Sequence, residues 1–244
     1  MATANINPTQ ATNLSTNLFG SATLAGFRNQ TTALQIDTTP DAQNTGGTQI
    51  QSVNFFGTKY YGRCLLSDYD LSGLPAGATI TGLVIKLYGT ADSPGMDTGQ
   101  VIFLEGTFGS TIATSDLDSF TGFTSGWDDS DVTEYSDAYG GDDWTLDAYN
   151  DITLNSDAVS AANTQFAAGN RFKMFGMEYE HWYSNDDFSL AAGKHINWVA
   201  NPGATNEMVL VVTYDEAAAT DLLSGPLKLN GGRLSILGGR LVIK

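Results

Sequence analysis

The chain has 244 residues and a formal charge of −16, with 27 acidic residues against 11 lysines and arginines. A surface of this sign repels the phosphates of DNA and RNA, so we expect no nucleic acid partner. Residues 1–8 carry no basic or apolar stretch and the chain has no apolar run of about 18 residues, so neither secretion nor membrane association is expected.

Cysteine and histidine are scarce. Cys64 is the one cysteine, which is typical of a protein folded in a reducing cytoplasm, and His181 and His195 are the two histidines. These residues cannot build a four-ligand structural zinc site, and no nucleophile-elbow, phosphate-loop or metalloprotease motif occurs. We therefore expect no enzyme, no cofactor and no metal. Residues 68–73 and 128–131 resemble cation loops, but a turn or a solvated loop explains each equally well.

Residues 1–50 are rich in Thr, Asn, Gln and Ala, which predicts a polar N-terminal arm with possible edge strands. Strand patterns begin at residue 53 and predict strands over 53–56, 60–66, 79–88 and 100–104. The third is the clearest. Pro75 and Gly77 close a turn before it, and its apolar residues then alternate with period two.

The middle of the chain is acidic. No lysine or arginine occurs between Lys86 and Arg171, whereas 15 acidic residues do. The aromatic residues scattered through 115–151 indicate ordered loops, because disordered acidic tails seldom carry so many. A short helix is predicted to begin after Asn155 or Ser156, to run through Phe166 and to end at Gly169.

Residues 171–183 alternate cleanly and predict a strand, followed by final strands over 196–199 and 208–214. The alternation puts Glu178, Glu180 and Trp182 on one face, which we expect to face solvent. Two uses of that face are open. Glu178 and Glu180 are candidate carboxylates of a glycosidase, although the pattern of known sandwich glycosidases is absent. Alternatively Trp182 and Trp144, with the two glutamates, are candidate contacts for a glycan.

The C-terminal part is predicted to be a linker and a glycine-turned β-repeat over 216–244. Residues 231–237 and 238–244 repeat a Gly-Gly-Arg-Leu pattern of seven residues. Short strands of this kind cannot bury both faces alone, so they need a partner, although a frayed tail is the alternative. The candidate anchoring or oligomerisation residues are Leu227, Leu229, Arg233, Leu234, Ile236, Arg240, Leu241 and Ile243. We expect a homo-oligomer, most simply a trimer, around these apolar faces.

Several segments resemble a module of tailed-bacteriophage structural proteins. They are the Leu-Pro-Ala-Gly-Ala-Thr-Ile-Thr-Gly turn and strand from Leu74, the Tyr-Gly-Gly-Asp-Asp-Trp element over 139–144, and the closing strand that ends in Tyr214. The resemblance covers about residues 30–215 and leaves out the C-terminal repeat. It implies an antiparallel, jelly-roll-like β-sandwich, an architecture that carbohydrate-binding modules share.

Together these observations predict an all-β protein with three parts: the arm over 1–50, a β-sandwich over 51–215 and the appendage over 216–244. The expected function is that of a non-enzymatic virion structural protein, a capsid decoration protein that binds the major capsid protein after assembly in the host cytoplasm. The first alternative is a tail-fibre or baseplate adhesin whose sandwich binds host glycans. The second is a glycoside hydrolase.

Overall fold

The structure is a computed structural model. It describes residues 1–18, 24–33, 35–37, 45–54, 58–90, 97–123, 131–184, 193–199, 205–217, 234–237 and 240–243. The strands are β1 (Ala2–Ile6), β2 (Gln10–Leu18), β3 (Gln35–Asp37), β4 (Thr45–Asn54), β5 (Thr58–Tyr69), β6 (Thr79–Tyr88), β7 (Asp97–Thr98), β8 (Gln100–Glu105), β9 (Tyr139–Gly140), β10 (Tyr149–Thr153), β11 (Phe172–Glu178), β12 (Gly193–Val199), β13 (Val209–Asp215), β14 (Leu234–Leu237) and β15 (Arg240–Ile243). The helices are α1 (Leu24–Arg28), α2 (Ser156–Ala168), the 3₁₀ turns η1 (Leu71–Gly73), η2 (Thr114–Asp116) and η4 (Gly141–Asp143), and the π-helix η5 (Tyr179–Tyr183).

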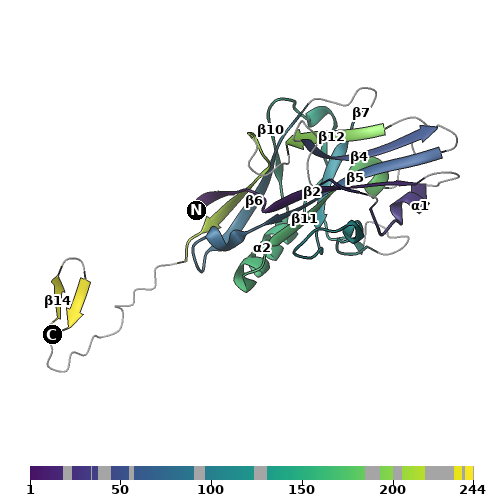
Figure 1. Cartoon of the computed structure of the whole chain (residues 1–244). Helices are drawn as coiled ribbons and strands as arrows, with labels where there is room; N and C mark the ends of the chain where they lie inside the picture. The colour runs from purple at the N-terminus through teal and green to yellow at the C-terminus, as the bar shows by residue number, and fades with distance from the viewer. Residues whose placement is uncertain are drawn as a thin grey trace.

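Two sheets form the body of the protein (Figure 1). The four-stranded sheet has the order β1-β13-β6-β10. The nine-stranded sheet follows the path β7-β12-β4-β5-β11-β8-β9, with β2 paired to β5 and β3 paired to β2. Among the described strands, all pairings are antiparallel apart from the short β12–β7 contact. The predicted all-β antiparallel sandwich is confirmed.

The main core lies between the two sheets. Strand β6 contributes Leu83, Ile85 and Leu87, each at most 1% exposed, as its alternation predicts. Strand β8 contributes Val101 and Phe103 from the facing sheet, and α2 closes the same core with Ala158 and Ala162. The sandwich therefore owes most of its stability to apolar burial between the sheets.

A second core covers the other face of the nine-stranded sheet. Ile102, Leu104 and Phe175 point to this side and are buried against α1, η5 and residues 106–123, whose contributions are Phe27, Phe108, Ile112, Leu117, Phe120, Trp182 and Tyr183. Neighbouring residues of β8 and β11 are thus buried on both faces. Such strands lose the polar alternation that marks a solvent-facing strand.

Helix α2 has the predicted ends. Asn155 caps it by accepting hydrogen bonds from the backbone N–H groups of Asp157 and Ala158, and Gly169 ends it in the left-handed conformation at φ 70°. The amide of Asn163 then joins the helix to β6, since it donates to the carbonyl of Ile80 and accepts from its N–H, both at 2.9 Å. These bonds fix the helix along the edge of the sandwich.

The predicted strand over 171–183 is wrong in its second half. Strand β11 ends at Glu178, and residues 179–183 form the π-helix η5 instead. The Glu178 side chain turns back and accepts hydrogen bonds from the N–H groups of Glu180, His181 and Trp182. A side chain that offers three acceptor bonds locally competes with the strand ladder, so the chain coils at this point.

The N-terminal residues belong to both sheets. Strand β1 is an edge strand of the four-stranded sheet, paired with β13, whereas β2 pairs with the long strand β5. Helix α1 lies in the same predicted arm, and its Phe27 is fully buried in the second core. The sandwich therefore begins before residue 51, because a polar sequence can form strands when neighbouring strands supply the hydrogen bonds.

The two last strands form a sheet of their own (Figure 1). Strands β14 and β15 pair as a hairpin in which Leu234 lies opposite Ile243 and Ile236 lies opposite Leu241. These pairs are two positions apart, so strand alternation places all four positions on the same face of the hairpin.

Candidate functional site

Glu178 is the carboxylate at the start of η5. It is 0% exposed, and its two carboxylate oxygens accept three backbone hydrogen bonds of 2.9–3.0 Å at the start of η5. Burial raises the pKa of this carboxyl to about 7, and the three N–H donors offset only part of that effect. Glu178 is therefore a structural cap that titrates near neutrality.

The contacts of η5 make this cap important for the second core. Trp182 is 3% exposed and packs its ring 5.0 Å from that of Phe27. Arg28 donates to the carbonyls of Trp182 and Tyr183, both at 2.6 Å. The cap, the helix α1 and the aromatic rings are thus parts of one packed unit.

These positions overturn the predicted solvent-facing platform. Glu178 and Trp182 are buried, and Glu180 lies in the π-helix rather than on a strand face. Trp144 is also buried, in the main core, with its ring 6.4 Å from that of Trp198. Glu178, Trp182 and Trp144 therefore cannot make the predicted contacts with a substrate or glycan, because other segments cover them. Glu180 is half-buried, and without Glu178 it has no partner carboxylate for the predicted glycosidase pair.

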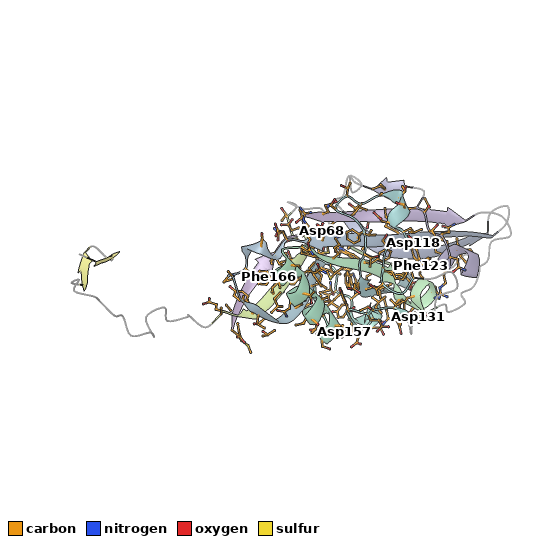
Figure 2. The ribbon with its side chains drawn as sticks, turned by 90° about the horizontal axis from the view of Figure 1, so that it is seen from below. Asp68, Asp118, Phe123, Asp131, Asp157 and Phe166 are labelled. Carbon is orange, nitrogen blue, oxygen red and sulfur yellow. The ribbon has the colours of Figure 1, made fainter. Side chains whose placement is uncertain are left out.

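The residues that do line a depression lie along α2. Two adjoining cavities of about 620 and 420 Å³ share Glu105, Tyr135 and Gln165 in their walls. The larger cavity continues to the end of the helix and the start of β11, where Arg171 and Lys173 line it. We call this depression the polar groove. Asp157 lies in its smaller cavity, in the first turn of α2 (Figure 2).

A buried carboxylate, Asp68, lies at the cationic end of the polar groove. Asp68 is 0% exposed and accepts hydrogen bonds from Arg171 at 3.0 Å and from Gln10 at 3.2 Å. The Arg171 side chain is 40% exposed and lines the cavity, while Asp68 fixes its position. Lys173 donates to the carbonyl of Phe108 at the same end. This end of the groove therefore has both positive and negative side chains, although the protein as a whole is acidic.

The wall that the two cavities share includes Tyr135. Its ring is 1% exposed and stacks on Phe172 with centroids 5.4 Å apart. Burial, followed by the nearby charge of Glu105, raises the pKa of the Tyr135 hydroxyl, so the hydroxyl stays protonated and bonds to Glu105. Glu105 also accepts a hydrogen bond from Thr121. The wall is therefore pre-organised and rich in hydrogen-bonding groups.

The carboxylates of the predicted cation loop over 68–73 bind other groups of the protein. Asp68 is the buried partner of Arg171, and Asp70 caps η1 by accepting from the N–H of Ser72. Within the described ranges, no group of three His, Cys, Asp or Glu side chains is close enough to hold a metal ion. Residues 128–130 of the other predicted loop lie outside those ranges. No helix in the described part of the chain has the length and apolar character needed to cross a membrane.

The predicted anchoring residues fall in two groups. Leu234 and Ile236 are in β14, and Arg240, Leu241 and Ile243 are in β15. The remaining ones, Leu227, Leu229 and Arg233, lie outside the described residues.

The architecture assigns the chain to the all-β sandwich proteins with mainly antiparallel sheets. A scan against protein-family models finds no match, and a search of curated proteins finds none. Function must therefore be argued from the surfaces of this molecule.

Sequence reasoning did not find the polar groove. Its walls come from five separate segments, represented by Asp68, Glu105, Tyr135, Gln165 and Arg171. No spacing within any one segment marks it. The available signal was the pair Arg171 and Lys173, which follows a long interval without any cation.

Proposed function

We propose that this protein is a non-enzymatic structural component of a tailed-phage particle, a capsid decoration protein displayed on the shell. The acidic sandwich is the displayed body, and the basic C-terminal repeat attaches it to neighbouring copies and to the major capsid protein. The phage assignment rests on the resemblance of the turn, loop and closing-strand segments described above.

The β14–β15 hairpin is the observation that carries the assembly part of the proposal. It is a two-stranded sheet of four-residue strands, and such a sheet is marginal in water without a further surface. Four apolar positions, Leu234, Ile236, Leu241 and Ile243, share one of its faces. Apolar faces of three copies can bury one another around a threefold axis, so we propose a trimer.

Deleting residues 226–244 is expected to leave the sandwich folded and to abolish oligomerisation and attachment to the particle. The strands of both sheets precede the deleted part, so the unfolding midpoint of the body should change little. Light scattering gives the mass of each protein, and binding to particles that lack this subunit gives attachment.

A second variant replaces Leu234, Ile236, Leu241 and Ile243 with serine and keeps the chain length. It should have the same effect as the deletion if the apolar side chains cause the assembly. A full-length protein that stays monomeric when concentrated contradicts the trimer. Hundreds of copies in a purified particle support the capsid location, whereas a handful place the protein in the tail.

Glycan binding by a tail-associated adhesin is the second candidate, and the polar groove favours it. The groove offers a guanidinium, an ammonium, two carboxylates and an amide within one depression, from Arg171, Lys173, Glu105, Asp157 and Gln165. Mixed donors and acceptors of this kind suit the hydroxyl groups of a saccharide.

On a glycan array, Gln165→Ala is expected to reduce any binding by the full-length protein about tenfold, because each lost hydrogen-bonding group weakens recognition. Gln165 is half-buried on α2, where alanine maintains the helix. Lys86→Ala is the control, since Lys86 pairs with Asp151 away from the groove. Equal binding by both variants, or no binding by the unaltered protein, contradicts this candidate.

A further inference from the structure

A second depression, apolar in character, lies between the Leu74–Ala78 turn and the last turns of α2. Its volume is about 550 Å³. Its lining residues are Ser72, Leu74, Ala76, Gly77, Ala78, Asn163, Phe166 and Ala167. Phe166 is half-buried there, and Figure 2 shows it toward one end of the sandwich. We call this depression the apolar groove.

Both walls of the apolar groove are rigid. In the turn, the N–H of Ala78 donates to the carbonyl of Pro75 at 3.0 Å, and Gly77 has a φ of 75° that favours glycine. On the helix side, Asn163 holds α2 against β6 through its two bonds to Ile80. The groove is therefore preformed, so a segment that enters it need not reorganise the body.

The residues that follow β13 lie at the rim of this groove. Strand β13 ends at Asp215, opposite Thr79 at the start of β6. Because the two strands are antiparallel, the residues after β13 run back beside the turn that precedes β6. Ala217 reaches that turn, since its Cβ lies 3.1 Å from the position that a Cβ on Gly77 would occupy.

The sequence beyond Ala217 suits an apolar groove. Residues 218–223 read Ala-Ala-Thr-Asp-Leu-Leu, and Leu222 and Leu223 are the first large apolar residues after Tyr214. Five extended residues span at most about 18 Å, which is enough for Leu222 to reach the groove of its own chain. A short tether also gives the segment an effective concentration in the millimolar range.

We propose that the apolar groove binds residues 218–223 of the same chain, with Leu222 and Leu223 covering Phe166 and Leu74. The bound segment removes apolar surface from water and fixes the point where the C-terminal repeat leaves the body. This docking goes beyond the proposed virion function and does not depend on it.

Disulfide trapping in the full-length chain tests the docking. Ala167→Cys, on the exposed rim, is combined with Ser224→Cys, one residue beyond the leucines. An intramolecular disulfide is expected under mild oxidation and is identified by peptide mass mapping. The native Cys64 does not interfere, because it is fully buried and burial raises the pKa of its thiol.

Two control variants separate docking from random collision of the tether. Leu222→Ser with Leu223→Ser removes the apolar side chains, and Ala76→Glu places a charge on the exposed groove rim without changing the core. Each is expected to slow trapping about tenfold or more, as loss of apolar burial predicts. Equal trapping rates in all variants overturn the proposal. A disulfide that forms only between two chains also overturns it and assigns the groove to a second copy.

Discussion

Replacing Glu178 with alanine is expected to lower the free energy of unfolding by about 3 to 5 kcal/mol, because three N–H groups, two of them buried, lose their acceptor at once. The loss should also loosen η5 and the packing of Trp182 on Phe27. Urea unfolding followed by tryptophan fluorescence measures the change. We expect this to be among the largest effects of a single substitution in the protein.

Glutamine at position 178 is the matched variant. Its carbonyl oxygen can replace the carboxylate oxygen that accepts from His181 and Trp182, whereas its NH₂ group faces the N–H of Glu180. The expected cost is smaller, about 1 to 2 kcal/mol. Asp142→Ala, at an exposed acid, is the control and should change stability by less than about 0.5 kcal/mol. Similar values for Glu178→Ala and Asp142→Ala would contradict the capping role.

The second large effect concerns pH. The pKa of Glu178 rises from 4.5 to about 7 on folding because the carboxyl is buried. Between these two values the folded protein binds one more proton than the unfolded chain, so the contribution of Glu178 to stability falls as the pH rises. It is largest below about 4.5 and stops changing above about 7, with a total loss of about 3 kcal/mol.

The comparison with Glu178→Gln isolates this contribution from the other acidic groups. Glutamine does not titrate, so the stability difference between the unaltered protein and the variant should shift by about 3 kcal/mol between pH 4 and pH 8. Unfolding curves at intervals of half a pH unit measure it. A difference that is constant with pH would show that Glu178 keeps an ordinary pKa in the folded protein.

The buried position of Glu178 also changes the functional argument. A carboxylate that bonds three N–H groups of its own chain has no accessible oxygen for a glycosidic bond, and Trp182 beside it offers no ring to a sugar. The proposed glycan binding is therefore assigned to the polar groove, where the Arg171 side chain is partly exposed. The proposed assembly is assigned to the C-terminal hairpin.

Local sequence predicted some elements completely. The turn at Pro75 and Gly77, with the alternation that follows, predicted β6 with its observed bounds, and the capping residues Asn155 and Gly169 predicted the ends of α2. Turn and capping residues determine the conformation of the few residues next to them in the chain. Strand β4 has a local signal only at its end, where the predicted strand over 53–56 overlaps it. Residues 45–52 are mostly polar or glycine, and they form a strand because β5 and β12 pair with them.

The site could not be predicted in the same way. Period-two alternation over residues 171–183 indicates which side chains share a face, but it does not indicate what covers that face. Here both faces of β11 are covered, and the strand ends where Glu178 finds three N–H donors. The polar groove needs Glu105, Tyr135 and Arg171 from distant segments, which meet only after the sheets have formed.

By itself, the sequence determined the all-β class, the turn before β6 and the ends of α2. The tertiary structure alone decided that Glu178 and Trp182 lie inside and that Arg171 faces a groove. The physical reason is the distance along the chain over which each effect acts. Backbone preferences and caps depend on neighbours in the chain, whereas burial depends on which other segments pack over a residue.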